Sequence, residues 1–476
     1  MSLGGCCFLA SSVRADDKPA APVAAPTPAA PAPKPASFYR EVRPILVDSC
    51  QGCHQPAKAG GKIVLTSHAD LGEGGRSRKA VVVPSKPDES ILMHVLLPKE
   101  GKPPEMPKDQ PPLSAEKIEL LRRWIAEGAR DDTPEAAKVD VSLEHPPVYL
   151  TPPVVTSLDF SPDGALLAVA GYHEVLLQKA DGSGIDGING RLVGQAERIE
   201  SVAFSPDGKL LVVAGGTPCT VGEVQVWDME KRKLKLSVPV THDTVYGASW
   251  SPDGALISFG CADNTVRCVE SATGKQVFFN LAHGDWVLDT VFSTDASHLV
   301  TVSRDRSMKL MQVKTEQFID NITSITPGAL AGGLIAVDRH PKKDEALVAG
   351  ADGVPKVYKL YRTQARQIGD DFNLIRKYDG LSGRIFAAKF NADGSRFVVG
   401  SSNDGLGEVR VYQTDDGKLI SSWAAPCAIY SVTFSPDGKV VAAAGFDGYV
   451  RLLNSDDGKV TKEYLPVPID SVERAL

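Results

Sequence analysis

A four-residue turn that recurs along the C-terminal part of the chain constrains its fold more than any other feature. Complete Ser-Pro-Asp-Gly copies begin at Ser161, Ser205, Ser251 and Ser435, and degenerate copies begin at Ser293, His340 and Asn391. Each copy lies between two short apolar segments, and successive copies start 42 to 51 residues apart. Because proline and glycine favour a tight reversal of the backbone, each copy predicts a hairpin of two strands.

Repeats of this length that are built from strands are typical of β-propellers, in which each repeat forms a four-stranded blade. The seven copies therefore predict an all-β propeller of seven blades over residues 151–476. Alternating apolar residues such as Val202 and Phe204 are expected to bury one face of each blade. Residues 133–150 form a connector that could supply the strand that closes the ring. We favour this strand over one from residues 464–467, near the other end of the propeller.

The repeats resemble WD repeats from about residue 150 to about residue 470. Trp227-Asp228 is the one intact copy of the pair that gives these repeats their name. The resemblance also rests on turn aspartates and candidate histidine partners: Asp263, Asp305, Asp404, Asp447, His242 and His283. It implies hydrogen-bonding roles for these residues and a surface that binds a protein ligand. The repeats show no nucleophile–base pair, phosphate loop or pair of catalytic carboxylates, which favours a binding protein over an enzyme.

A second feature, Cys50-Gln51-Gly52-Cys53-His54, has the spacing of a haem c attachment motif. In such a motif each thiol forms a thioether with a haem vinyl group, and the histidine binds the iron as proximal ligand. The alternatives are half of a zinc site and a redox dithiol. A zinc ribbon needs a second close pair of ligands, and a redox pair needs a strand–helix context that is not visible here. We therefore expect one covalently attached haem c, held by Cys50, Cys53 and His54.

The second axial ligand of the iron is expected between this motif and the helix predicted for residues 114–128. Met106 lies there in a proline-rich loop, and a thioether suits the iron of an electron-transfer site. The competing candidates are Met93, His94 and His68. Met93 belongs to an apolar segment that predicts a buried helix, so we expect it to pack in the core and favour Met106 as the ligand.

Residues 37–132 resemble the planctomycete-type cytochrome c domain. Besides the haem motif, the resemblance rests on Phe38, Pro44-Ile45-Leu46, Gly60-Gly61, Pro84–Ser90, Met106-Pro107 and the helix up to Gly128. It implies a small all-α domain with one haem, and it supports the methionine before proline, Met106, as distal ligand. The chain departs from the family at Gln55, where glycine is common, and at Lys108, where a second proline is common. Neither position carries an iron ligand.

Residues 1–15 resemble the end of an export signal, with Val13-Arg14-Ala15 as a candidate cleavage site. Leu3-Gly4-Gly5-Cys6 also resembles a lipobox, in which Cys6 would carry a lipid anchor. Residues 16–36 are rich in alanine and proline and predict an extended linker of roughly 60 Å, at about 3.1 Å per residue. Because haem c is attached outside the cytoplasm, we expect an exported protein, periplasmic or at the cell surface, either free or tethered to a membrane.

The formal net charge of −7 and the pI near 5.8 argue against a nucleic-acid partner. No apolar run reaches the roughly 18 residues of a membrane-spanning helix. The sequence thus predicts a multidomain protein for electron transfer or haem-based redox sensing, with a redox partner protein and a protein ligand of the propeller. The alternatives are a propeller-based oxidoreductase fed by the haem and a cell-surface scaffold whose haem is structural.

Overall fold

The computed structural model describes residues 34–55, 58–75, 79–99, 101–108, 110–134, 141–187, 190–325, 331–367 and 369–470. The expected export signal, Cys6 and nearly all of the expected linker lie outside these residues. None of the helices in these ranges has the length and apolar composition of a membrane span. Residues 34–134 and residues 141–470 have separate hydrophobic cores.

The N-terminal part, residues 34–134, is mainly helical. Its elements are η1 (Phe38–Val42), α1 (Arg43–Ser49), β1 (His54–Gln55), β2 (Lys58–Ala59), η2 (Gly60–Lys62), η3 (Ala69–Gly72), η4 (Pro87–Glu89), α2 (Ile91–Leu96) and α3 (Ala115–Ala126). β1 and β2 pair because the backbone reverses directly after the haem motif, where the Gly60 N–H donates to the Cys53 carbonyl oxygen at 2.8 Å. The structure therefore adds one short β pair to the helices that the resemblance implies.

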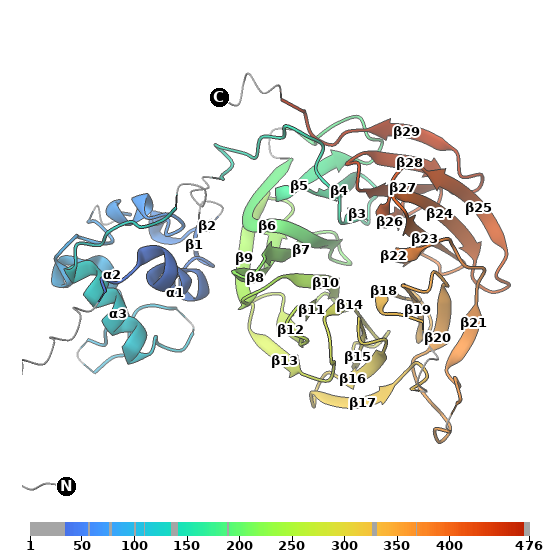
Figure 1. The fold of residues 1–476 in the computed structure, drawn as a ribbon, viewed down its shortest axis with the longest axis horizontal. Coiled ribbons are helices and arrows are strands. Elements are labelled where there is room, and N and C mark those ends of the chain that lie inside the picture. The colour runs from blue at the N-terminus through green and yellow to red at the C-terminus, as the bar shows by residue number, and fades with distance from the viewer. Residues whose placement is uncertain are drawn as a thin grey trace, which may run out of the picture. The chain divides into compact units, whose positions relative to one another are not determined.

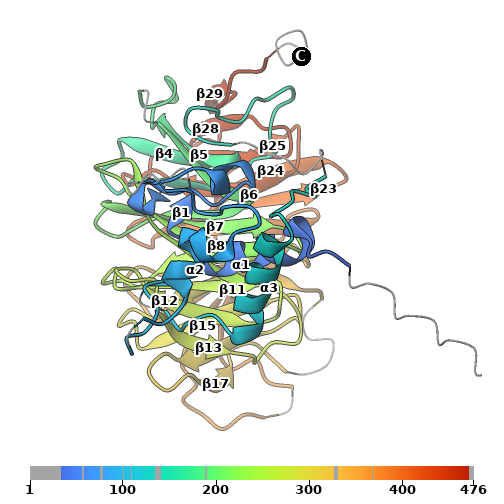
Figure 2. The same ribbon diagram turned by 90° about the vertical axis from the view of Figure 1, so that its left-hand side faces the viewer.

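The core of this part is formed by the apolar faces of its helices, and Figures 1 and 2 show α1, α2 and α3 next to one another. Leu46 of α1 and Leu121 and Trp124 of α3 are fully buried in it. Apolar residues recur along these helices every three or four positions, which places them on one face. Packing of that face, rather than helix propensity alone, stabilises helices this short.

Side-chain caps set the ends of the helices in the N-terminal part. Ser37 accepts a hydrogen bond from the Arg40 N–H, and Ser114 caps α3 in the same way. Asp132 joins the two ends of the N-terminal part. Its carboxylate accepts hydrogen bonds from the Ser37 hydroxyl at 2.5 Å and from the Tyr39 N–H at 2.8 Å.

The C-terminal part consists of antiparallel sheets whose strands follow one another in chain order. The first sheet has seven strands: β3 (Leu158–Phe160), β4 (Leu166–Ala170), β5 (Tyr172–Lys179), β6 (Arg191–Phe204), β7 (Leu210–Thr217), β8 (Val221–Asp228) and β9 (Lys233–Thr241). The next two have four strands each: β10 (Val245–Trp250), β11 (Leu256–Cys261), β12 (Val266–Glu270), β13 (Gln276–Asn280), and β14 (Val287–Phe292), β15 (His298–Ser303), β16 (Met308–Gln312), β17 (Gln317–Asn321).

Three more four-stranded sheets complete this part. They are β18 (Leu334–Arg339), β19 (Glu345–Gly350), β20 (Lys356–Lys359), β21 (Leu374–Lys377); β22 (Arg384–Phe390), β23 (Arg396–Asn403), β24 (Leu406–Gln413), β25 (Leu419–Ala425); and β26 (Ile429–Phe434), β27 (Val440–Gly445), β28 (Val450–Asn454), β29 (Val460–Tyr464). Figure 1 shows the sheets arranged around a common centre. Contacts between successive inner strands, from β10 through β26, and between β26 and β3 close the ring. The C-terminal part is thus a multi-blade β-propeller.

The recurrent turns form the hairpins between the first and second strands of the blades. In the first of them the Ser161 hydroxyl donates to Asp163 Oδ1 at 2.5 Å and accepts the Leu166 N–H at 2.9 Å. The other complete copies repeat both bonds. In the degenerate copy at Asn391 the amide oxygen accepts the Arg396 N–H at 3.0 Å in place of the serine hydroxyl. The turn therefore tolerates substitution because one acceptor side chain is sufficient.

The connector differs from the expectation that it closes the ring as a strand. Residues 141–157 contain no strand, and β29 is the fourth strand of the last sheet. Pro146, Pro147, Pro152 and Pro153 have no N–H to contribute to a ladder. Instead, the Tyr149 hydroxyl donates to Glu174 Oε1 at 2.8 Å, and the Asp470 N–H donates to the Tyr149 carbonyl oxygen.

Candidate haem site and propeller channel

The haem motif begins where α1 ends. Cys50 follows the last residue of α1, and its N–H donates to the Leu46 carbonyl oxygen at 2.9 Å. The His54 N–H then donates to the Cys50 carbonyl oxygen at 3.1 Å, so a single turn of backbone joins the first thiol to the histidine. Cys50 is half-buried and Cys53 is exposed, and both are free thiols. This is the order of groups that a haem c motif requires: two thiols and an imidazole at the end of one helix.

The imidazole of His54 is held by the loop that follows it. His54 Nδ1 lies 3.3 Å from the Ile63 carbonyl oxygen. Because a carbonyl oxygen can only accept, Nδ1 carries the proton, and Nε2 keeps its lone pair for a metal ion. A Cβ at Gly60 would lie 3.3 Å from His54 Cε1 and 2.9 Å from the Cys53 carbonyl oxygen. Glycine at position 60 therefore allows the loop to fold closely over the ring.

Gln55, one of the two departures from the family pattern, is buried beside the motif. Its Nε2 donates to the Gln51 carbonyl oxygen at 3.1 Å, and Gln51 Nε2 in turn donates to the Leu65 carbonyl oxygen at 2.8 Å. The Oε1 atom of Gln55 is buried without a partner among the described residues. The Gln55 side chain therefore stabilises the backbone of the motif through its hydrogen bond to Gln51, which glycine could not make because it has no side chain.

The structure separates the candidates for the second axial ligand. Met106 is half-buried in its loop, packs against the core of the N-terminal part, and donates its N–H to the Val95 carbonyl oxygen at 3.0 Å. Met93 is only 1% exposed within the core, and His94 is exposed to solvent. His68 Nε2 lies 2.6 Å from the Ala129 carbonyl oxygen, with the ring edge-on to Phe38 and Trp124. Met93 and His68 are thus engaged in packing and hydrogen bonding.

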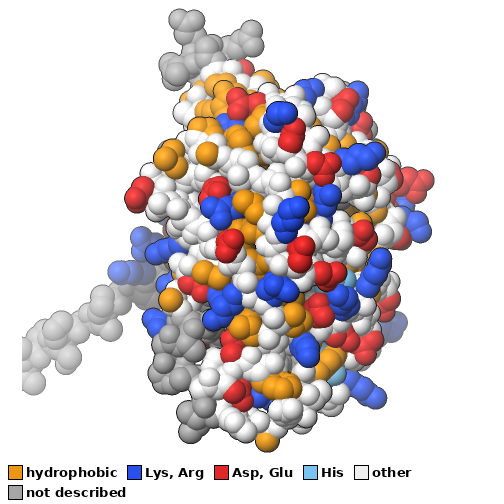
Figure 3. All heavy atoms as spheres, turned by 90° about the vertical axis from the view of Figure 1, so that its right-hand side faces the viewer, with side chains coloured by type: hydrophobic (Ala, Val, Ile, Leu, Met, Phe, Trp, Pro, Cys, Tyr) orange, Lys and Arg blue, Asp and Glu red, His pale blue; other side chains and the backbone are white. Residues whose placement is uncertain are grey.

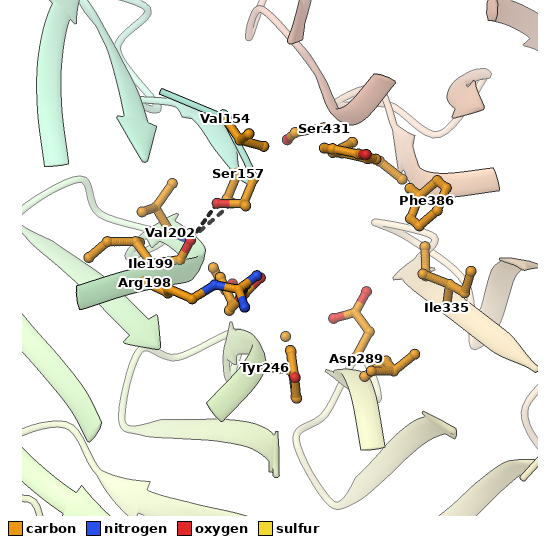
Figure 4. A pocket seen from close by; sticks show the side chains of 18 of the residues that line it. Val154, Ser157, Arg198, Ile199, Val202, Tyr246, Asp289, Ile335, Phe386 and Ser431 are labelled. Carbon is orange, nitrogen blue, oxygen red and sulfur yellow. Dashed lines mark hydrogen bonds and ion pairs between the residues drawn. The ribbon is translucent and has the colours of Figure 1, made fainter. Parts of the chain in front are cut away.

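A channel of about 1450 Å³ runs between the inner strands of the propeller (Figure 4). Side chains along it bond neighbouring inner strands to each other. The Ser157 hydroxyl accepts the Val202 N–H at 3.0 Å, as the dashed line in Figure 4 marks. In the same way, Asp159 accepts the Phe204 N–H at 2.8 Å. Asp289, Asp338 and Ser431 make equivalent bonds at other seams. These polar side chains of the channel hold the ring of blades together.

One cation lies among these channel carboxylates. Lys389 Nζ is 3.5 Å from Asp338 Oδ1, and the carboxylate of Asp338 raises the pKa of Lys389. Burial raises the pKa values of Asp159 and Asp289 to about 6, against the opposing effects of Lys389 and backbone N–H groups. Because the Lys389 side chain is 45% exposed to the channel, solvent weakens all these interactions.

Sequence reasoning missed this cluster, although a signal for it exists. Asp159, Asp338 and Lys389 each stand two residues before the first residue of a recurrent turn. In the other repeats this position is uncharged. Because this repeat position faces the centre of the ring, closure of the ring brings its charged residues together.

The turn aspartates that resemble those of WD repeats have structural partners. Asp305 Oδ2 is 2.9 Å from His283 Nδ1, and the Ser307 hydroxyl donates to Asp305 Oδ1 at 2.6 Å. In other blades the turn aspartate pairs with a basic residue four positions later: Asp263 with Arg267, Asp352 with Lys356, and Asp447 with Arg451. His242 and Asp404 are exposed, and no side-chain hydrogen bond to the other WD-type positions is found for them among the described residues. Trp227 Nε1 donates to Gln225.

Among curated proteins, the chain is similar to eukaryotic translation initiation factor 3 subunit I of Aspergillus niger. The two are 27% identical over 237 residues, which cover 49% of this chain and 56% of that protein. The same subunit of Sclerotinia sclerotiorum is 25% identical over 231 residues, or 48% of this chain and 55% of that protein. The same subunit of Aspergillus oryzae is 26% identical over 245 residues, which cover 50% of this chain and 60% of that protein. The chain thus spans little more than half the length of the curated relatives it matches.

Family models match both parts of the chain. Residues 50–110 match the model described as Planctomycete cytochrome C, which spans the haem motif and Met106. Residues 146–176, 189–228, 234–269, 274–310 and 417–454 match the model described as WD domain, G-beta repeat. The chain is therefore a fusion of a planctomycete cytochrome c domain with WD repeats.

Proposed function

We propose that this protein is an exported monohaem cytochrome c that transfers electrons, and that its propeller binds a protein partner. The observation that carries the proposal is the orientation of His54, whose Nδ1 is engaged by the Ile63 carbonyl oxygen at 3.3 Å. An imidazole held through Nδ1 presents Nε2 as a ligand of fixed direction. The thiols of Cys50 and Cys53 stand within one turn of it, as thioether attachment requires.

The residues present fit a haem c group. Cys50 and Cys53 would hold it through thioethers, His54 would be the proximal ligand, and Met106 the distal one. Met106 is supported by its loop and by the other roles of Met93 and His68, which leave the exposed His94 as the remaining competitor. When bound, the haem supplies reversible one-electron chemistry. Pro104 and Pro107 flank Met106 and restrict the loop, which lowers the entropy that its thioether loses on binding.

The blade count of seven is supported by the long strand β6. Its first residues pair with β5, with Leu192 opposite Val175, and its last residues pair with β7, with Val202 opposite Val213. Residues 158–241 therefore contain two four-stranded units that share β6, and the five separate sheets complete the seven. This count agrees with the seven recurrent turns in the sequence.

Export is supported by the chemistry of the haem motif and by the leader-like residues 1–15. Thioether attachment takes place after export, so the motif is useful only in a chain that leaves the cytoplasm. The proposed location is the periplasm or the cell surface, with residues 16–36 as a spacer and Cys6 as the candidate lipid anchor.

A redox titration of the purified full chain, followed by visible absorption, tests the electron-transfer role. The proposal is supported if small redox mediators reduce and reoxidise the haem reversibly and the fraction of reduced haem follows the potential as a one-electron couple does. A haem that mediators neither reduce nor oxidise would instead leave the protein as a scaffold with a structural haem.

A further inference from the structure

We propose that the mouth of the propeller channel at the side of β14, β18 and β22 binds a protein segment that presents acidic side chains next to an apolar one. The proposal deepens the protein-binding role proposed above and rests on it. Five lining residues define this surface, which we call the arginine arc: Trp286, Arg304, Arg306, Arg384 and Phe386.

The arginine arc has an exposed apolar component. Trp286 is 37% exposed, and its ring stacks on that of Tyr246 at 5.9 Å between centroids. Phe386 meets Tyr430 edge-on at 5.1 Å, and Phe446, which also lines the mouth, is 62% exposed. Aromatic side chains that line a concave surface and remain accessible are typical of sites that take up an apolar side chain of a partner.

The charge of the arc is positive and largely unneutralised. Arg304 lies over the Trp286 ring at 4.6 Å and 3.6 Å from Asp285. The other carboxylates that line the channel are Asp159, Asp289, Glu197 and Glu200, of which Glu200 is paired with Arg198. The side chains of Arg306 and Arg384 have neither ion pair nor hydrogen bond with any residue that the structure describes. The two unpaired guanidinium groups favour a partner that brings its own carboxylates, which arginine can bind through two parallel hydrogen bonds.

The channel below the arc does not offer a competing cation. Lys389, the basic residue further along it, faces Asp338 at 3.5 Å and is also attracted by Asp289 and Asp159. An acidic segment therefore finds unpaired positive charge at the mouth and not inside the channel.

The opposite end of the channel carries the opposite charge. The recurrent turns lie there, because each inner strand runs from the mouth to its turn. The turns, together with the residue after each, hold seven aspartates, Asp163, Asp207, Asp253, Asp295, Asp344, Asp393 and Asp437, against four lysines, Lys209, Lys342, Lys343 and Lys439. Serine hydroxyl and backbone N–H groups lower the pKa values of most of these aspartates, which keeps them ionised.

The part of the propeller rim that Figure 3 shows has no such separation of charge. On the face in Figure 3, basic and acidic side chains alternate, with hydrophobic side chains scattered between them. An acidic partner is therefore attracted to the mouth, repelled at the turn end and not selected at this rim.

The experiment selects random displayed peptides for binding to the full, haem-loaded chain. Peptides enriched on the native chain are expected to be acidic and to contain an aromatic or aliphatic residue. They should bind an Arg306→Glu/Arg384→Glu double variant at least about tenfold more weakly, and added salt should weaken their binding to the native chain. Neither substituted side chain has a bond to lose, so the variant is expected to keep its melting temperature and haem spectrum.

The matched control is Lys342→Glu/Lys439→Glu, two charge reversals at the turn end, which should leave binding unchanged. Enrichment of neutral or basic peptides, or of acidic peptides that bind both double variants equally, would overturn the arginine arc but leave a protein-binding propeller intact. If no peptide is enriched, both the arc and the protein-binding role are wrong. Single-stranded oligonucleotides of random sequence form the last arm, and binding as tight as that of the acidic peptides would overturn the proposal in favour of a nucleic-acid site.

Discussion

The Nδ1 atom of His54 lies 3.3 Å from the carbonyl oxygen of Ile63, nine residues further along the chain. The contact exists because the backbone reverses at Gly60 and returns past the imidazole ring. It orients the histidine before any ligand is bound, so the loop of residues 58–63 becomes part of the site although it supplies no ligand. The turn at Gly60 thus helps to hold His54 in the orientation that the proposed proximal ligand of the iron needs.

The first prediction follows from that turn. Gly60→Ala would place a methyl group 2.9 Å from the Cys53 carbonyl oxygen and 3.3 Å from His54 Cε1. The loop must move, and we expect a loss of about 1–3 kcal/mol in the stability of the N-terminal part. Because the thiols are untouched, haem should still be attached, with an altered absorption spectrum. Gly72→Ala is the control, since a Cβ at Gly72 meets nothing within 4 Å. Equal spectra and melting temperatures for the two variants would argue against the role of Gly60.

The second prediction distinguishes the two methionines of the N-terminal part. Met106→Ala should abolish the weak red absorption band of sulfur bound to ferric iron and should lower the reduction potential, because a thioether favours the ferrous state. Met93→Ala should keep the band but lower stability by about 2–5 kcal/mol, because it leaves a cavity in the core. Loss of the band in Met93→Ala alone, or in His94→Ala, would show that the ligand is assigned to the wrong residue.

How far the sequence predicts the structure can be seen from particular residues. The recurrent turns were predictable because Ser161, Asp163 and Gly164 act within a few residues of one another. The backbone turn that carries Cys50, Cys53 and His54 is equally local, and the haem expected on it stays a prediction. The short β pair that begins at His54 was not, because the pattern of apolar residues does not reveal the pairing of His54 with Ala59 and of Gln55 with Lys58.

Features that depend on distant partners were also missed. The connector was expected to form a strand, but its prolines prevent this and Tyr149 anchors it to Glu174, 25 residues away. The cluster brings Lys389 together with a carboxylate up to 230 positions away in the chain, because Asp159 belongs to the first inner strand. Such pairs become visible only when the ring is closed.

The third prediction tests the anchor of the connector. Glu174 is completely buried and accepts hydrogen bonds from the Tyr149 hydroxyl at 2.8 Å and from Arg191 at 2.6 Å. Tyr149→Phe leaves the buried carboxylate with one donor fewer, and we expect a loss of about 1–3 kcal/mol in propeller stability, measured by denaturant unfolding. Tyr430→Phe is the control, because no hydrogen bond of its hydroxyl is found among the described residues. An unchanged midpoint for Tyr149→Phe would mean that the connector does not hold the ring.

The fourth prediction concerns the pH dependence of propeller stability. Burial lowers the pKa of His283 below its ordinary value of 6.5, against the effect of its hydrogen bond with Asp305. The unfolded chain therefore binds a proton that the folded chain does not, so this contribution is present above pH 6.5 and is lost as the pH falls below it. Burial opposes a low pKa at Asp305, but hydrogen bonds from His283 and Ser307 outweigh it, so the pKa of this carboxyl is depressed. Its contribution to stability is therefore present above about pH 4 and is lost only below that pH.

The comparison uses His283→Asn over pH 7 to 5. Asparagine has no titrating group, so the variant should show a shallower fall in unfolding free energy with falling pH than the native chain, although it is less stable at pH 7. Parallel curves for the two proteins would contradict the assignment of the proton to His283.

The most direct test of the account is the intact mass of the chain purified from the periplasm of a host with an active cytochrome c maturation system. Covalent attachment through Cys50 and Cys53 should add the mass of one haem that survives extraction with acidified acetone, and Cys50→Ala/Cys53→Ala should show no added mass. His54→Ala should keep the covalent group, because the thioethers remain, while its spectrum changes through loss of the proximal ligand. Exported native chain without any added mass, under conditions in which a known cytochrome c is matured, would contradict the central claim.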